Sequence, residues 1–276
     1  MRDDLFDVHA DIEDRHWWFV ARRQILRSIA DAVLPTTPAS VVLDIGCGTG
    51  ANAAAFTNDH QVVGLDPHAE GIAHARRRFP DATFINGSTP HDVTDVLPNV
   101  RLALLTDVIE HLPDDFEAVS TWLAALPVGS HLLITVPADP ALWSRHDEVF
   151  GHYRRYTVDR LAAVWAGLPV TCRLHSPFNS RLYPVVKAIR HWRRMRGGTE
   201  RGDDFKIGNP TTNSALRRVF AGEAAALRRS LDGPSRPYRH GVSQIALLRR
   251  KAGPLTVRTR PAEISADVHN PSEPHL

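Results

Sequence analysis

A glycine-rich loop that begins with a carboxylate is the first group of residues in this chain that could do chemistry. Asp44 is followed by Gly46, Gly48 and Gly50, with one residue between successive glycines. Glycine lets the backbone turn sharply and approach a ligand without a Cβ in the way. The loop follows the apolar run 41–43, which predicts a buried strand, and it precedes a helix-tolerant segment. We therefore expect a ligand between a strand end and a helix N-terminus.

A second carboxylate, Asp66, lies 22 residues after Asp44, at the end of the apolar run 61–65. The carboxyl ends of parallel strands meet at the edge where open α/β sheets bind ligands, and a carboxylate there can accept both hydroxyls of a ribose. A dinucleotide loop usually reads Gly-x-Gly-x-x-Gly and holds a pyrophosphate, which Asp44 would repel. The acid suits the ammonium of an amino-acid moiety, which favours S-adenosylmethionine (SAM) over NAD. The alternative is that the glycines only form a turn and Asp66 caps a helix.

Apolar runs and helical segments alternate at intervals of about 20 residues and predict the elements that position these groups. The expected strands are 41–43, 61–65, 83–85, 102–105, 131–136, 169–176 and 241–248, and the expected helices are 4–34, 51–58, 68–79, 114–126 and 157–166. We predict an α/β fold with a Rossmann-like, doubly wound, mostly parallel seven-stranded sheet, an N-terminal helix and a helical insertion before the last strand. One domain is expected over 1–251, with 177–240 as an insertion that covers the substrate and 252–276 as a disordered tail.

Three blocks of this sequence resemble the class I SAM-dependent methyltransferases, in particular their type 11 group. Residues 41–50 are similar to motif I of that family, residues 62–66 to its second motif, and residues 106–112 to its fourth-strand motif DVxEHL. The resemblance runs from about residue 15 to 250 and implies a methyltransferase with SAM as cofactor. The cofactor-binding residues that we predict with it are Asp44, Gly46, Cys47, Gly48, Gly50, Asp66, Pro67, Ser88, Asp107, Val108 and Arg22.

The chain departs from the family pattern after the third expected strand. The family commonly has Gly-Asp there, with a carboxylate that accepts a hydrogen bond from the adenine amino group. This chain has Gly87-Ser88 instead. A serine hydroxyl or a backbone carbonyl can accept the same bond, but more weakly.

A narrower resemblance links residues 15–23 and 142–156 to a bacterial subgroup of these enzymes, which pairs an aromatic N-terminal helix with a WSxxDxxxGHxRRY-like block. The subgroup pattern also places Arg22 near the SAM carboxylate, because arginine makes bidentate contacts with carboxylates. The substrate-binding residues that we predict in these two blocks are Trp17, Trp18, His152, Arg154, Arg155 and Tyr156.

Histidines after the fourth and fifth expected strands are candidates for acid–base chemistry. A general base helps methyl transfer to a hydroxyl, and histidine suits that role near neutral pH. His146 lies in a polar loop and is the first candidate, with His111 as the second. The alternative for His111 is that it only holds its loop together with Glu110. The spacing of the histidines fits no tight metal signature, so no metal is expected.

Composition narrows the class of protein further. Cys47 and Cys172 form no CxxC pair, which argues against a disulfide framework and favours a cytoplasmic protein without a secretory signal. Residues 1–150 carry 10 Lys/Arg and 22 Asp/Glu, whereas residues 151–276 carry 23 and 9. The basic half is either a solvated surface or attracts an anionic or lipid-linked substrate or, weakly, a membrane surface. No nucleic-acid motif and no apolar run long enough for a transmembrane span is present.

The sequence thus predicts transfer of a methyl group from SAM to a small-molecule acceptor, with O-methylation favoured over N-methylation. Three alternatives stay open. One is a SAM-binding protein of the same fold with non-methylating chemistry. The others are a non-catalytic module at a membrane surface or in a complex, and a nicotinamide oxidoreductase. The oligomeric state is left open.

Overall fold

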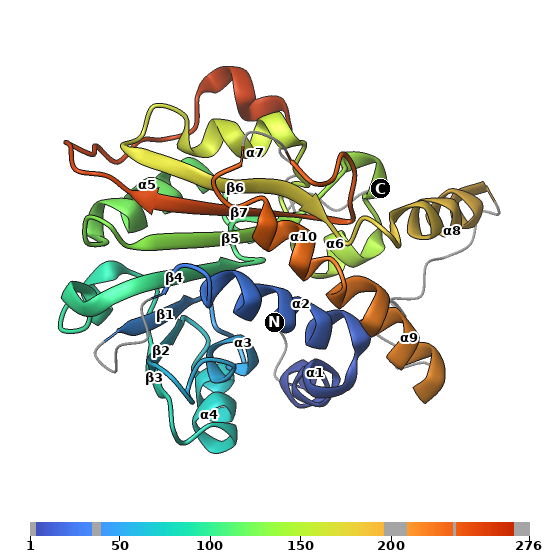
Figure 1. Cartoon of the computed structure of the whole chain (residues 1–276), viewed down its shortest axis with the longest axis horizontal. Helices are drawn as coiled ribbons and strands as arrows, with labels where there is room; N and C mark the ends of the chain where they lie inside the picture. Colours follow the sequence, from blue (N-terminus) through green and yellow to red (C-terminus); the bar gives the residue numbers. More distant parts are fainter. Residues whose placement is uncertain (1–3, 35–39, 196–208, 234–235, 268–276) are drawn as a thin grey trace.

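The computed structural model describes residues 4–34, 40–195, 209–233 and 236–267. Its strands form one seven-stranded sheet in the order β3-β2-β1-β4-β5-β7-β6 (Figure 1). Neighbouring strands are parallel except that β7 runs antiparallel to both β5 and β6. The strands are β1 Val41–Ile45, β2 Gln61–Asp66, β3 Thr83–Asn86, β4 Val100–Thr106, β5 His131–Pro137, β6 Val170–Phe178 and β7 Ser243–Arg250. The predicted Rossmann-like, mostly parallel sheet is confirmed.

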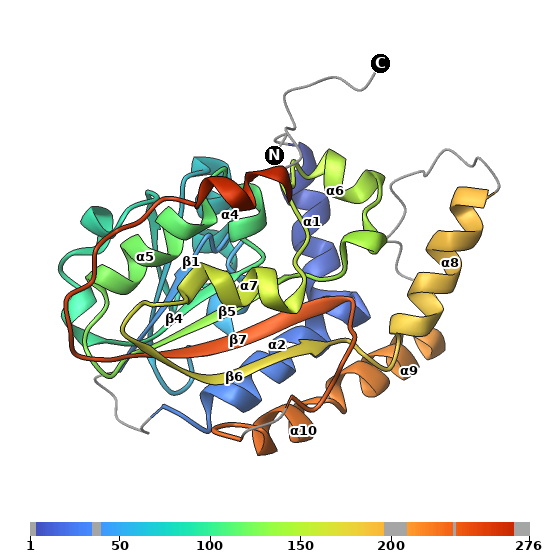
Figure 2. The same cartoon turned by 90° about the horizontal axis from the view of Figure 1, so that it is seen from above.

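Helices cover both faces of this sheet (Figures 1 and 2). One buried cluster joins α5 and α7 to the first face, and another joins α2, α4, α9 and α10 to the second. Side chains alternate between the clusters, so that Leu43 packs in the first and Val42 in the second. The helices are α1 Asp4–Arg15, α2 Trp17–Ala30, α3 Ala51–Ala54, α4 Ala69–Arg78, α5 Asp115–Ala125, α6 Arg145–Val149, α7 Val158–Trp165, α8 Tyr183–Met195, α9 Pro210–Ala221 and α10 Ala224–Arg229. Strands buried on both faces explain the continuous apolar runs of the sequence.

The N-terminal region forms two helices and not the single helix predicted over 4–34. The break is at His16, whose side-chain Nδ1 accepts a hydrogen bond from the Trp18 N–H at 3.3 Å and so caps α2. Beyond the break, α1 leaves the sheet face and lies against α4, where Arg78 donates to the Ala10 carbonyl at 3.1 Å. The same guanidinium donates to the Thr49 carbonyl at 3.1 Å, so α1 is anchored beside the glycine loop.

After the end of β6, the described part of the predicted insertion 177–240 is mainly helical, and it packs on the body of the protein. Phe220 of α9 and Leu227 of α10 are fully buried in the second core cluster and pack these helices against α2. The helix α8 reaches the loop after β5, where Arg194 donates to the Ala141 carbonyl at 2.9 Å. The insertion therefore completes one face of the sheet and extends from it as α8. Residues 196–208 of the predicted insertion lie outside the described residues.

The segment after β7 differs from the predicted disordered tail. The Arg258 N–H donates to Ser120 Oγ of α5 at 3.0 Å, and its guanidinium donates to the carbonyl of Val164 in α7 at 2.7 Å. Leu255 and Ile264 pack against the first core cluster. As far as residue 267 this segment is therefore part of the fold, and residues 268–276 lie outside the described part of the chain.

A buried carboxylate at the start of α5, Asp115, collects donors from the segment after β5. Arg160 donates to its two oxygens at 3.0 and 2.8 Å, and the Tyr156 hydroxyl donates at 2.9 Å. The Asp115 side chain is fully buried, and only 6% of the Arg160 side chain is exposed. Removing one partner of such a pair leaves the other charge buried and uncompensated.

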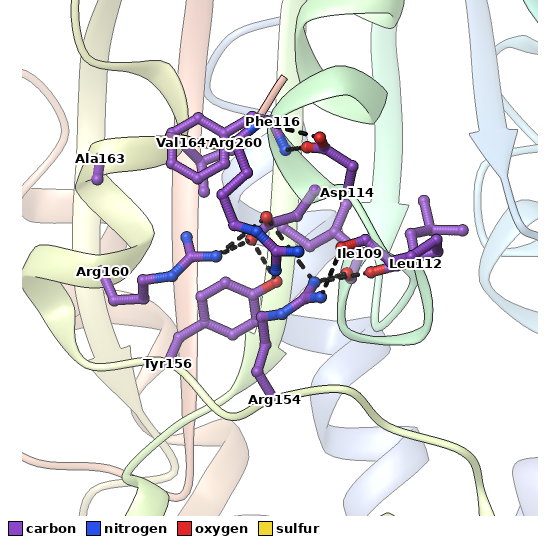
Figure 3. Close-up of polar contacts among 12 residues, drawn as sticks. Ile109, Leu112, Asp114, Phe116, Arg154, Tyr156, Arg160, Ala163, Val164 and Arg260 are labelled. Atoms are coloured by element: carbon purple, nitrogen blue, oxygen red, sulfur yellow. Dashed lines mark hydrogen bonds and ion pairs between the residues drawn. The ribbon is translucent and has the colours of Figure 1, made fainter. Parts of the chain in front are cut away.

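Arg154 ties the same segment to the loop after β4, which begins with η3 Ile109–His111 (Figure 3). Its guanidinium is 1% exposed and donates to three main-chain carbonyls, at 2.8 to 3.2 Å. The three acceptors are Ile109, Leu112 and Pro113. The loop that carries Glu110 and His111 is therefore held from outside the sheet as well as by β4.

We expect Asp115→Ala to lower the free energy of unfolding by about 3–5 kcal/mol, because Arg160 would stay buried without its carboxylate. Urea denaturation followed by circular dichroism measures this loss. The control is Asp11→Ala, which breaks the exposed Arg15–Asp11 pair on α1 and should cost about 1 kcal/mol or less. A loss for Asp115→Ala no larger than that of the control would contradict the structural role of Asp115.

Candidate cofactor and acceptor site

The glycine loop after β1 has a backbone that requires glycine. Gly46, Gly48 and Gly50 have φ angles of +73°, +53° and +87°, in the region where L side chains are strained. A Cβ on Gly46 would lie 2.6 Å from Val108 Cγ2, and a Cβ on Gly50 would lie 2.8 Å from Phe84 Cζ. The loop therefore packs closely on β3 and on the end of β4. At the three glycine positions it has no side chains between its backbone and a ligand.

Asp44 places a fully buried carboxylate at the base of this loop. Neither of its oxygens has a hydrogen-bond partner among the residues that the structure describes. Burial raises the pKa of Asp44 to about 7, against the opposing charge of Arg22. A buried carboxylate without partners is costly. The site therefore fits a ligand group that brings both donors and positive charge, and an ammonium does both.

Asp66 ends β2 beside the loop and helps to shape it. One carboxylate oxygen accepts from the Gly48 N–H at 2.8 Å, and the other accepts from the His68 N–H at 2.8 Å. Asn86, at the end of β3, donates to the carbonyls of Asp66 at 3.0 Å and of Pro67 at 2.9 Å. Asn86 was not among the predicted residues, although a polar residue at the end of the third strand was a signal for it. The predicted Asp66 and Pro67 thus lie at one sheet edge with the loop.

The missing acid after Gly87 is partly replaced by Asp92, which the sequence analysis did not select. Asp92 Oδ2 accepts from the N–H groups of Ser88 at 3.0 Å and Thr89 at 2.8 Å. These backbone bonds, together with the Thr89 hydroxyl, lower the pKa of Asp92. The Asp92 carboxylate therefore lies at the turn that contains Ser88, although Asp92 is four residues further along the chain. Cys47 is buried in the second core cluster, where burial raises the pKa of its thiol well above the ordinary value.

Asp107, directly after β4, joins the N-terminal helices to the site. Its φ of +56° is unusual for a residue other than glycine and marks a strained turn. Its carboxylate forms an ion pair with Arg22 of α2 and accepts from Thr135 Oγ1 at 3.2 Å. The Arg22 guanidinium lies 4.4 Å from the Trp18 ring, and burial lowers its pKa to about 10. Its Nε is buried without a partner in the described structure and could still donate to a ligand.

The three histidines predicted on the acceptor side lie together. The His152 ring centroid is 4.6 Å from that of His111 and 6.1 Å from that of His146. His152 Nδ1 lies 2.9 Å from Asp147 Oδ1, and Arg155 donates to both oxygens of Asp147 at 2.8 and 3.0 Å. Although burial alone would raise the pKa of Asp147, its bond to His152 and the charge of Arg155 hold it well below the usual range. Asp147 is therefore an ionised group that fixes His152.

Glu110, next to His111, is a second fully buried carboxylate. Neither of its oxygens has a hydrogen-bond partner within the described ranges, and burial raises its pKa to about 8. Burial also lowers the pKa of His111 to about 4, so its imidazole is neutral at physiological pH. The Tyr153 N–H donates to the Glu110 carbonyl at 2.7 Å and connects the two loops.

Three of the predicted substrate-binding residues are used inside the protein. The polar groups of Arg154 and Tyr156 are taken up by main-chain carbonyls and by Asp115, and those of Arg155 by Asp147 and the Ala138 carbonyl. All three side chains are buried. These side chains therefore position the loops of the site. Arg154 Nε has no hydrogen-bond partner among the described residues, and a substrate-binding role for the three residues stays a prediction. His152 stays within the site.

The two predicted tryptophans have different surroundings. The Trp17 ring packs edge-on against Phe220 of α9, with ring centroids 6.1 Å apart, and the backbone N–H of Trp17 donates to Asn213 Oδ1 at 2.9 Å. Trp18 covers the Arg22 guanidinium, which pairs with Asp107. Trp18 therefore lies at the rim of the site, whereas Trp17 mainly joins α2 to α9.

Comparisons with known proteins point to methyltransferases. Residues 42–127 match the family model described as a methyltransferase domain. Trans-aconitate 2-methyltransferase from Afipia carboxidovorans is 28% identical over 109 residues, covering 38% of this chain and 42% of that protein. A dTDP-3-amino-3,4,6-trideoxy-alpha-D-glucopyranose N,N-dimethyltransferase from Streptomyces venezuelae is 37% identical over 88 residues, covering 30% and 37%. The chain thus spans less than half the length of these curated relatives.

Solved structures share the whole fold at low identity. A chain of the complex between the Haloferax volcanii Trm112 methyltransferase activator and the putative methyltransferase gives a TM-score of 0.55 at 15% identity, covering 92% of this chain and 97% of that one. The [4+2]-cyclase SpnF gives 0.51 at 17% identity, covering 84% and 81%. The fold and its glycine loop define a Rossmann-like domain of the SAM-binding type. Over residues 42–127 the chain carries a methyltransferase domain, and it is similar to class I SAM-dependent methyltransferases.

We expect Asp44→Asn to stabilise the ligand-free protein at pH 8 by roughly 1–3 kcal/mol while abolishing cofactor affinity. Because the pKa of Asp44 is raised to about 7, the folded state binds its proton more tightly than the unfolded chain. This carboxyl therefore makes stability fall as the pH rises from about 4 to 7. Asparagine mimics the protonated form, so the variant should gain less at pH 5 than at pH 8. Urea denaturation at both pH values and calorimetry with S-adenosylhomocysteine measure the two effects. Equal stability changes at both pH values, or unchanged affinity, would contradict this assignment.

Proposed function

We propose that this chain transfers a methyl group from SAM to a small-molecule acceptor, with O-methylation favoured over N-methylation. The observation that carries the proposal is the buried Asp44 carboxylate, which has no partner among the described residues and lies below a loop of positive-φ glycines. An ammonium group would compensate this charge. When bound, SAM supplies a methyl group that the positive sulfur has already activated.

Different residues around the loop would contact different parts of the cofactor. Asp44 would hold the ammonium, and the unpartnered Nε of Arg22 is placed to meet a carboxylate of the same amino-acid moiety. Asp66 Oδ2 accepts the Gly48 N–H and keeps a second lone pair for a ribose hydroxyl, whereas Oδ1 accepts the His68 N–H and also lies 3.0 Å from His68 Nδ1. Pro67 and Ser88 lie beside Asp66 and would border the adenine, with Asp92 supplying the carboxylate that the family pattern has next to Gly87.

The histidine cluster supports oxygen as the methylated atom. A hydroxyl must lose its proton during methyl transfer, whereas an amine attacks through its own lone pair and needs a base less. His146 is our first candidate for that base and His111 the second. The low pKa of His111, about 4, makes it a poor proton acceptor and strengthens the preference for His146. N-methylation stays the second choice, and an N,N-dimethyltransferase is among the relatives.

A non-methylating reaction is the rival function, because the [4+2]-cyclase SpnF has the same fold. The two functions differ in one product. A methyltransferase releases S-adenosylhomocysteine in proportion to a methylated acceptor, and a cyclase of this fold leaves SAM unchanged. The deciding experiment is therefore a screen of small molecules with methyl-labelled SAM, with Asp66→Ala as the variant that weakens cofactor binding. Label in no acceptor and no S-adenosylhomocysteine release would favour the rival.

We expect His146→Ala to lower kcat by about 100-fold or more while changing the Kd for S-adenosylhomocysteine less than about twofold, because a general base contributes 10²–10⁴ to the rate. Kinetics of S-adenosylhomocysteine release and calorimetry measure the two quantities. The control is His60→Ala, just before β2 at the opposite edge of the sheet, which should change neither. If His111→Ala shows this pattern and His146→Ala does not, His111 is the base. If neither does, the proposed base catalysis is wrong.

The surface of α8 supports a second part of the proposal, a weak association with an anionic membrane surface. Four apolar side chains at helical spacing are 45–70% exposed along this helix, which projects from the body of the protein (Figure 2). They are Val185, Ile189, Trp192 and Met195. Lys187, His191 and Arg194 are exposed on the same helix. An apolar stripe beside basic residues is typical of helices that lie in a membrane interface. Among the described residues, no helix is long and apolar enough to cross a bilayer.

This surface bears on the acceptor. Arg194 also donates to the carbonyls of Ala141 and Trp143, in the loop that leads to His146. A helix resting on a membrane would therefore place the acceptor side of the site close to that membrane. We propose on this basis that the acceptor is anionic or carried on a lipid.

Replacing Ile189 and Trp192 together by glutamate should reduce sedimentation with vesicles of phosphatidylcholine and phosphatidylglycerol by about fivefold or more, because the change removes apolar area and adds negative charge. The control is Val128→Glu, since Val128 is 62% exposed just before β5 and far along the chain from α8. It should leave sedimentation unchanged. Equal binding by the double variant and the control, with folding verified by circular dichroism, would exclude α8 as the membrane contact.

A further inference from the structure

The fold brings together three metal-binding side chains that the sequence separates. Glu110 and His111 follow β4, whereas His152 comes 41 positions after His111, beyond β5 and α6. One carboxylate oxygen of Glu110 and one ring nitrogen of each histidine lie within 4.8 Å of one another. Two imidazoles and one carboxylate are a ligand set that binds divalent ions such as Zn²⁺, Mn²⁺ and Fe²⁺. Small side-chain movements would bring the three atoms to a common centre.

Glu110 provides the second, independent observation. Its side chain is fully buried and neither oxygen has a partner in the described part of the chain. Arg22 and Arg155 contribute favourable charge, but no hydrogen bond from either reaches this carboxylate within the described residues. A native protein rarely leaves such a group unsatisfied without a functional reason or a bound ion. A cation would compensate the carboxylate at this position.

His152 is held in the manner of a metal ligand. His152 Nδ1 is bonded to Asp147 at 2.9 Å, which orients the ring and leaves Nε2 for another partner. Asp147 is itself fixed by Arg155 and by the Ser144 N–H at 2.8 Å. A carboxylate behind a ligating imidazole is the usual outer-shell arrangement of metal sites.

We propose that Glu110, His111 and His152 form a binding site for one divalent transition-metal ion, with Asp147 as the group that orients His152. The expectation of no metal rested on spacing along the chain, and only the folded loops bring the ligands together. Three protein ligands leave coordination positions for water or for an oxygen of the acceptor. The role toward an acceptor rests on the proposed O-methylation, but metal binding does not. In this arrangement His111 is a metal ligand, and His146 is the base that accepts the proton of the acceptor hydroxyl.

The test is metal binding by the full chain without a histidine tag, after treatment with a chelator. Mn²⁺ is titrated with detection of the free ion by electron paramagnetic resonance, and Zn²⁺ by calorimetry. We expect one ion per chain, and at least about tenfold weaker binding by Glu110→Gln and by His152→Ala. Asp147→Asn should weaken binding by about 10–100-fold through the orientation of His152. The control variants His60→Ala and Asp92→Asn should bind as the unchanged protein does.

The outcomes separate the metal site from the proposed reaction. Glu110→Gln is close to isosteric, and its melting temperature without metal shows whether it folds; His152→Ala serves if it does not. Absence of stoichiometric binding, or equal binding by the ligand variants and the controls, would overturn the metal site whatever the activity. Binding of one ion by a protein that transfers no methyl group would keep the site and overturn the proposed function.

Discussion

Two buried carboxyl groups without partners in the described ranges, at the carboxyl edge of the sheet, are the constraint on which this structure depends. Asp44 and Glu110 are both fully buried, and neither has a hydrogen-bond partner among the described residues. Arg22 is the cation whose charge acts on both of them, and its guanidinium pairs with a third carboxylate, Asp107. Leaving two carboxyls unmatched costs stability, which the apolar core on both faces of the sheet must offset. The protein thus keeps two places open for positively charged ligand groups.

The loops around Asp44 and Glu110 must be held in place, because otherwise these carboxyl groups could move to hydrogen-bond donors within the protein. The loop after β4 would relax toward a donor if it were free to move, but Arg154 holds three of its carbonyls, and Arg160 holds Asp115 just beyond it (Figure 3). On the other side, Arg155 and Ser144 hold Asp147, and through it His152. The arginines near residue 155 therefore act on the site indirectly. In a motif with arginines next to a histidine, the arginines can hold the fold while the histidine acts in the site.

The strands and the cofactor loop were predictable because their causes are local. The central strands β1, β2, β4 and β5 each contain a continuous apolar run, and the glycines of the loop after Asp44 are required by their own φ angles. The break of the first helix at His16 depends on where α1 packs, which is a tertiary contact. The segment 252–267 has little apolar content and is held by Arg258 donating to main-chain carbonyls, so composition alone suggested disorder. The approach of His152 to Glu110 likewise requires two loops to be placed in space, whereas the contact of Asp92 with Ser88 is local and the sequence analysis missed it.

The cofactor side and the acceptor side are linked through five consecutive residues. Asp107 and Val108 border the glycine loop, and Glu110 and His111 follow within one turn of η3. The contact between Gly46 and Val108 is so close that a Cβ at position 46 would lie 2.6 Å from the valine. Together with the strained turn at Asp107, this contact fixes how far the histidine cluster stands from the loop. Methyl transfer depends on the alignment of donor and acceptor to within a fraction of an ångström or so. The same turn that brings the two sides together therefore sets the geometry of the reaction.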